Sequence, residues 1–154
     1  MVSLLDVNVL IALAWPNHVH HEVALNWFGA NQRLGWATCP VTQAGFVRVS
    51  ANRRVLPDAV PPHEALALLR RIVALPHHRF WTDDIELVSS KFVAAEKLVG
   101  YRQVTDAHLL ALALRHGGRV ATLDAGLREL VPAGVVAGEA VCVLAHPAAG
   151  ANRG

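Results

Sequence analysis

Short apolar runs alternate with amphipathic segments along the 154 residues of this chain. Four runs are largely apolar, as expected for strands that are buried on both faces of a parallel sheet: residues 2–5, 35–39, 119–123 and 140–144. A fifth strand is expected at 78–82. Because predicted helices separate these runs, the pattern predicts an α/β domain in which helical crossovers connect parallel strands.

Apolar residues that recur every three or four positions predict the helices. Four of them have bounds set by Pro, by Gly or by a capping residue: residues 7–15, 40–52, 63–75 and 105–116. In the last of these, Thr105 is the expected N-cap. Three more helices are expected to begin at polar residues, namely Asn17, Asp83 and Asp124.

The composition fits a globular domain, with 53% hydrophobic and 17% charged residues and a formal net charge of +2. We expect one domain over residues 1–146 and a flexible tail over 147–154. No apolar stretch has the ~18 residues of a membrane span, and no basic residue precedes the first apolar run as in a signal peptide. We therefore expect no membrane association, and a cytoplasmic protein in which Cys39 and Cys142 are reduced.

Three aspartates stand where elements of the predicted fold begin. Asp6 and Asp124 each follow an apolar run and precede a predicted helix, and Asp106 lies in the first turn of another. Ligands of open parallel sheets bind beyond the carboxyl ends of the strands, so one crevice is expected to hold all three carboxylates. Their repulsion would raise their pKa values unless a cation lies between them, and Mg²⁺ or Mn²⁺ suits a carboxylate site. The alternative is that each aspartate only caps its helix.

Several sequence blocks resemble one protein family. The blocks LLDVNVLIAL (4–13), TDAHLLALAL (105–114) and VATLDAGL (120–127) are similar to PIN-domain ribonucleases, in particular VapC-type toxins of bacterial toxin–antitoxin pairs. They occur in the order of the family, and the resemblance runs from about residue 2 to 145. It implies a PIN-like three-layer α/β/α sandwich around a central, mainly parallel sheet of four to five strands.

The resemblance also implies an activity. Such a protein is a toxin and a metal-dependent endoribonuclease that hydrolyses RNA phosphodiester bonds, with tRNA and rRNA as expected substrates. On this resemblance, Asp6, Asp106 and Asp124 are the catalytic residues and the ligands of Mg²⁺ or Mn²⁺.

The residues expected beside the aspartates depart from the family pattern at one position. Asn8 and Thr122 are small polar residues that would orient carboxylates or metal-bound water. The family has a Glu where this chain has Gln43, which supplies no negative charge. We therefore expect weaker metal affinity, and an alternative function stays open: a non-catalytic PIN-like module that binds RNA or a partner protein.

Basic residues indicate how RNA would be held. Twelve of the 14 basic residues are Arg, whose guanidinium suits phosphate, although a GC-rich genome produces the same bias. Arg48, Arg53 and Arg54 follow Gln43 along the same predicted helix and its end. They are expected to contact the RNA backbone, and the alternative is an ordinary solvated face.

The resemblance further implies a protein partner. A cognate VapB-type antitoxin is expected to lay its C-terminal segment in an apolar groove lined by Trp15, Trp27 and Phe28. A homodimer is also expected, with operator DNA contacted only through the antitoxin.

Two other chemistries fit the residues less well. The histidines of NHVHH (17–21) lack a second pair of ligands with the spacing of a transition-metal site. A phosphatase that uses Asp6 covalently would need a second Asp two residues on, where this chain has Asn8.

Overall fold

Five parallel strands form the centre of the protein, in the spatial order β3-β2-β1-β4-β5, in a computed structural model that describes residues 1–145. The strands are β1 (Ser3–Leu5), β2 (Trp36–Thr38), β3 (His78–Phe80), β4 (Arg119–Thr122) and β5 (Val141–Val143). All five predicted strands are present, and the predicted parallel α/β fold is confirmed.

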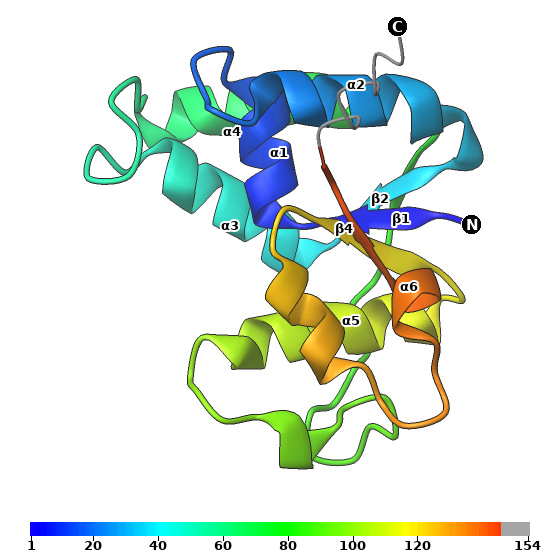
Figure 1. The fold of residues 1–154 in the computed structure, drawn as a ribbon. Coiled ribbons are helices and arrows are strands. Elements are labelled where there is room, and N and C mark those ends of the chain that lie inside the picture. The colour runs from blue at the N-terminus through cyan, green and yellow to red at the C-terminus, as the bar shows by residue number, and fades with distance from the viewer. Residues whose placement is uncertain (146–154) are drawn as a thin grey trace, which may run out of the picture.

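Helices cover both faces of the sheet and give three layers (Figure 1). One face carries α1 (Val7–Ala14), α2 (His21–Asn31), α3 (Pro40–Ser50) and α4 (Pro62–Val73). The other face carries α5 (Gln103–Arg115) and α6 (Ala137–Ala140). Three short 3₁₀ helices complete the described chain: η1 (Gln32–Leu34), η2 (Ala95–Lys97) and η3 (Ala125–Leu130).

Alternation along the strands separates the interior into two hydrophobic cores. Leu4 and Val120 are fully buried in the core that α5 completes. Leu5 and Ala121, one residue further along, are fully buried in the core under α1 and α2. Successive side chains of a strand point to opposite faces, so each apolar strand supplies both cores. This is why successive positions of the inner strands β1, β2 and β4 are apolar.

A glycine allows the close approach of α1 and α3. A Cβ at Gly45 of α3 would lie 2.6 Å from the Val7 Cγ2 atom, at the first residue of α1. Such a contact cannot be relieved by a small side-chain motion, because a β-branched residue in a helix has one strongly preferred rotamer. Gly45 therefore fixes where α1 starts, directly after Asp6.

One predicted helix is wrong. The apolar spacing at Ile85, Val88 and Phe92 predicts a helix after Asp83, but residues 81–94 form turns and irregular chain, and Val88 is 89% exposed. Local side chains take the backbone groups that a helix would use: Asp83 accepts from the Ile85 N–H, and Ser90 accepts from the Phe92 N–H. Asp and Ser side chains compete with helical hydrogen bonds in this way.

Two predicted helix starts are also shifted. The α2 helix begins at His21, because the Asn17 amide donates to the Asp58 carboxylate at 3.1 Å and does not cap the helix. The α5 helix begins at Gln103, so Thr105 lies inside the helix. Asp106 still falls in the first turn, as predicted.

No helix within residues 1–145 combines the length and the apolar character needed to cross a bilayer. The tail predicted at 147–154 lies outside the described residues. The domain boundary at residue 146 stays a prediction.

We expect Gly45→Ala to lower the free energy of unfolding by about 1–3 kcal/mol, because the new methyl group overpacks the contact with Val7. Gly29→Ala is the matched control. It also lies within a helix, but its added Cβ meets nothing within 4 Å, so it should be neutral or stabilise by up to about 1 kcal/mol. Urea unfolding measures both changes, and equal effects would contradict the close approach of α1 and α3.

Candidate active site

The carboxyl ends of the neighbouring strands β1 and β4 bring two of the aspartates together. Leu5 pairs with Ala121 in the sheet, and the Asp6 N–H donates to the Ala121 carbonyl at 2.9 Å. Asp124 follows β4 by two residues. Within the sheet, β2 and β3 lie on one side of β1, and β4 and β5 lie on its other side, so the strand order reverses at β1. A crevice for ligands forms at such a reversal of strand order.

Asp6 is held by two hydrogen bonds. Its Oδ1 accepts from the Val7 N–H at 2.7 Å and caps α1, and its Oδ2 accepts from the Thr122 hydroxyl at 2.8 Å. The side chain is 8% exposed. Burial raises the pKa of Asp6 above its ordinary value, against these two hydrogen bonds, and the charge of Asp124 adds to the increase.

The Thr122 hydroxyl connects the residues of the site. Besides donating to Asp6, Thr122 Oγ1 accepts from the Asn8 amide at 3.2 Å and from the Asp124 N–H at 3.0 Å. Asn8 Oδ1 in turn accepts from the Leu123 N–H at 3.2 Å. Asn8 and Thr122 thus lie where the sequence places them, between the first and last aspartates.

Asp106 comes to the same place from the other side of the sheet. It is half-buried in the first turn of α5. Burial, together with the negative charges of Asp6 and Asp124, raises the pKa of Asp106 to about 6. Asp124 is exposed, and its Oδ1 accepts from the Gly126 N–H at 2.8 Å to cap η3.

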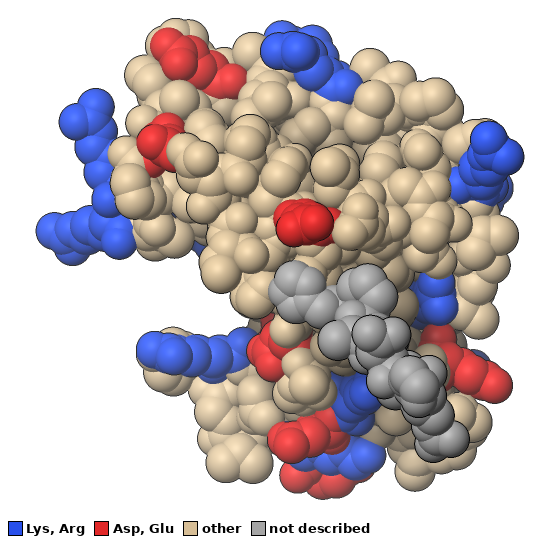
Figure 2. Space-filling model, turned by 45° about the horizontal axis from the view of Figure 1, so that its top comes forward, with Lys and Arg blue, Asp and Glu red and all other residues tan. Residues whose placement is uncertain are grey.

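The three aspartates line one cleft of about 420 Å³. Asn8 and His18 complete its polar wall, and the other lining residues are apolar: Val7, Ile11, Val49, Val55 and Leu56. No Lys or Arg lines the cleft in the described chain. Basic side chains instead project around a notch at the left edge of the surface in Figure 2.

The donor chemistry of the cleft fits a hard divalent cation. Carboxylate oxygens are the ligands that Mg²⁺ and Mn²⁺ prefer, and a cation would offset the repulsion that raises the pKa of Asp106. Within residues 1–145, however, no three His, Cys, Asp or Glu side chains form a ready-made ligand cluster. Mg²⁺ keeps several of its waters in protein sites and therefore needs few direct protein ligands.

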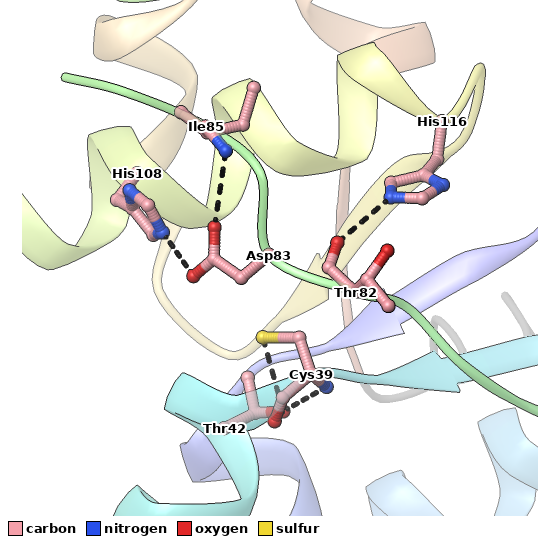
Figure 3. A network of polar contacts seen from close by, with 7 residues as sticks. All are labelled: Cys39, Thr42, Thr82, Asp83, Ile85, His108 and His116. Atoms are coloured by element: carbon pink, nitrogen blue, oxygen red, sulfur yellow. Dashed lines mark hydrogen bonds and ion pairs between the residues drawn. The ribbon is translucent and has the colours of Figure 1, made fainter.

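A separate set of contacts holds the α5 helix that carries Asp106 (Figure 3). The Asp83 carboxylate lies 2.6 Å from His108 Nε2 on α5 and also accepts from the Ile85 N–H. At the end of α5, His116 stacks on Trp81, with ring centroids 4.5 Å apart. The irregular segment after β3 therefore contacts α5 near its middle and at its C-terminal end, although it is not the helix predicted there.

Gln43 does not line the cleft, contrary to its expected place beside the aspartates. Its amide donates to Thr38 Oγ1 at 3.0 Å, and Thr38 Oγ1 lies 2.8 Å from His78 Nε2. Burial lowers the pKa of His78, which favours the neutral ring that accepts from the Thr38 hydroxyl. Gln43 instead faces a groove between α3 and α4.

The predicted arginines divide between two places. Arg48 is exposed on α3 and lines the α3–α4 groove. Arg53 and Arg54 are exposed in the turns after α3, next to Val55 and Leu56, which line the acidic cleft. Only the last two therefore directly precede residues of the acidic cleft in the chain.

The three aromatic residues predicted to line a partner groove do not line one groove together. Phe28 is 8% exposed and packs edge-on against Trp36 in the core, so it cannot line a surface groove. Trp27 is half-buried against the same core. Trp15 is half-buried, and its indole N–H donates to Ser50 Oγ at 3.2 Å.

His18 is the cleft residue that sequence reasoning missed. The sequence predicts a helix from Asn17, but His18 lies in the loop before α2 and lines the cleft with the aspartates. Burial lowers the pKa of His18, and the neighbouring His20 and His21 add to the decrease. Sequence position contains no signal for this, because only the packing of α1 brings the loop to the cleft.

The fold and the site define a class of protein: a parallel α/β/α domain whose acidic cleft is lined by aspartates from two strand ends and one helix start. The chain belongs to the PIN domain family, whose model matches residues 3–131. The predicted family membership is thereby confirmed.

Two relatives from Mycobacterium tuberculosis span nearly the whole chain. Ribonuclease VapC39 is 48% identical over 136 residues, which are 88% of this chain and 98% of that protein. Ribonuclease VapC38 is 54% identical over 129 residues, which are 84% of this chain and 89% of that protein.

Two solved structures share the fold. VapBC2 from Rickettsia felis, bound to a DNA fragment from its promoter, superposes with a TM-score of 0.58 at 12% identity and covers 86% of this chain and 97% of its own. The Mycobacterium tuberculosis toxin VapC20, which cleaves the sarcin-ricin loop, superposes with a TM-score of 0.58 at 16% identity, covering 89% and 98%. These likenesses confirm the three-layer α/β/α fold.

We expect Thr122→Val to lower the free energy of unfolding by about 1–3 kcal/mol, because it removes the partner of Asp6 Oδ2 and of the half-buried Asn8 amide nitrogen. Thr122→Ser keeps the hydroxyl and should cost about 1 kcal/mol or less. Chemical unfolding of both variants measures the difference. A valine variant as stable as the serine variant would show that the hydroxyl does not organise the site.

Proposed function

We propose that the protein is a toxin of the VapC type, an endoribonuclease that hydrolyses RNA phosphodiester bonds with the help of Mg²⁺ or Mn²⁺. The observation that carries the proposal is the convergence of Asp6, Asp106 and Asp124 on one cleft without a compensating basic residue in the described chain. The ribonuclease names of relatives at 48% and 54% identity support the reaction class.

The three aspartates would hold the cation. When bound, it supplies positive charge to the substrate phosphate and lowers the pKa of the attacking water. Asp6 is pre-oriented by Thr122 and Val7, so its carboxylate needs no rearrangement. One proton of that water is released to solvent as it attacks, and the leaving 3′-oxygen takes up a proton. Water attacks the phosphorus, the bond to the 3′-oxygen breaks, and the 5′-phosphate stays on the other fragment.

The partner of such a toxin is a VapB-type antitoxin, as the VapBC2 complex indicates for its own toxin. We propose the groove of about 570 Å³ between α3 and α4 as its docking place, rather than the surface near Trp27 and Phe28. Ala44, Val47 and Leu66 give this groove apolar walls, and Arg48 adds a positive charge for an acidic residue of the antitoxin. A homodimer, contact with operator DNA only through the antitoxin, and a cytoplasmic location stay predictions.

The second candidate is a non-catalytic module that binds RNA or a partner. The specific observation in its favour is that Gln43 contacts Thr38 and adds nothing to the cleft, which leaves three carboxylates for the cation. Cleavage of RNA in the presence of Mn²⁺ therefore distinguishes a ribonuclease from a module that only binds.

We expect Asp6→Asn and Asp106→Asn each to lower the rate of RNA cleavage by about 100-fold or more, because each removes a negative charge from the cation site. Asp84→Asn is the matched control, since Asp84 is an exposed carboxylate paired with Arg115 away from the cleft. Cleavage of total RNA by the free toxin with Mg²⁺ or Mn²⁺, and with a chelator, measures the rates.

Circular dichroism checks that the variants are folded. Full activity in both cleft variants would contradict the proposal. Binding of RNA without cleavage in the wild-type protein, in Mg²⁺ and in Mn²⁺, would support the non-catalytic module.

A further inference from the structure

A second hollow continues the acidic cleft. It has a volume of about 360 Å³ and is lined by Trp15, Asn17, His18, Val55, Leu56, Pro57 and Asp58. His18, Val55 and Leu56 line both spaces, so the two lie next to one another. A polymer whose phosphate lies at the aspartates would place a neighbouring group in this hollow.

The lining has a flat apolar wall and a polar edge. Trp15 is half-buried, and the hydrogen bond from its indole to Ser50 fixes the ring. Leu56, which is 9% exposed, adds apolar surface to the lining. At the edge, the Asn17 amide donates to Asp58 Oδ2 at 3.1 Å, and Asp58 Oδ1 has no donor among residues 1–145. Proteins recognise unpaired nucleobases with this combination of aromatic faces and hydrogen-bonding edges.

The loop that forms one side of the hollow is built by its own hydrogen bonds. Asn52 makes three of these hydrogen bonds. The Asn52 carbonyl accepts from the Val55 and Leu56 N–H groups at 3.0 and 2.9 Å, and the Asn52 side chain accepts from the Arg54 N–H at 3.0 Å. The same loop carries Arg53 and Arg54, which are exposed. This loop thus carries two arginines that can contact RNA phosphates, and it forms one side of a hollow that can hold a base.

We propose that this hollow binds an unpaired nucleobase adjacent to the scissile phosphate, and that Asp58 selects guanine. A carboxylate accepts two parallel hydrogen bonds from the N1–H and the 2-amino group of guanine. Cytosine and adenine offer only an amino group, and uracil only its N3–H. The negative charge of Asp58 disfavours a phosphate at this position. The inference rests on the proposed ribonuclease function for its substrate.

Binding of 5′-mononucleotides tests the hollow without cleavage. GMP, CMP, AMP and UMP share the same phosphate, so differences among them report on the base. The NMR signal of the Trp15 indole N–H should shift saturably, with GMP binding most tightly. We expect Asp58→Asn to weaken GMP binding by about tenfold or more, while Glu64→Gln, an exposed carboxylate on α4, changes nothing. Asn17→Ala is a second variant of the edge and should also weaken GMP binding.

Sequencing of RNA ends tests the selection during cleavage. The wild-type toxin should cut with guanine enriched at one position beside the cut, and Asp58→Asn should lose that enrichment. Equal binding of the four nucleotides, or an unchanged enrichment in the variant, would overturn the proposal. If Asp58→Asn instead only releases a copurifying antitoxin, the hollow belongs to the protein interface and the proposal is wrong. GMP selectivity without RNA cleavage would refute the ribonuclease and leave the base site standing.

Discussion

The hydrogen bond from the Thr122 hydroxyl to the Asp6 carboxylate connects the ends of β4 and β1, and the geometry of the acidic cleft depends on it. The same oxygen receives the Asn8 amide and the Asp124 N–H, so one buried hydroxyl orients two aspartates and their polar neighbour. These contacts exist because β1 and β4 are adjacent and in register. Two central strands are thereby made into the rigid support that a catalytic site requires.

The cost of this arrangement is concentrated negative charge. Asp6, Asp106 and Asp124 line one partly buried cleft, and repulsion and burial together raise the pKa of Asp106 to about 6. Structural aspartates at helix starts would not need to share a cleft, since each could cap its helix alone. The convergence therefore favours a site whose charge is balanced by a ligand. A hydrated divalent cation together with an RNA phosphate fits this need.

The parts of the site that were predictable from sequence follow from local rules. Asp6 and Asp124 come after apolar strands, and the sheet places parallel strand ends together. Gln43 and His18 were not predictable, because their positions depend on tertiary contacts. Gln43 turns toward Thr38, and His18 reaches the cleft through a loop. Sheet order and family pattern therefore located the aspartates with Asn8 and Thr122, while the places of Gln43 and His18 had to be seen in three dimensions.

Titration of the Asp106 carboxyl carbon by NMR, with and without Mg²⁺, is the most direct measurement of whether the cleft is a cation site. Without cation we expect the pKa of Asp106 to be about 6, and with Mg²⁺ to fall toward or below its ordinary value of 3.8. The Asp84 carboxyl, whose pKa is already held low by Arg115, should not respond to Mg²⁺ and serves as the internal reference. An Asp106 that titrates near 3.8 without cation, or whose pKa is unchanged by Mg²⁺, would contradict the acidic cleft as the place where the cation binds.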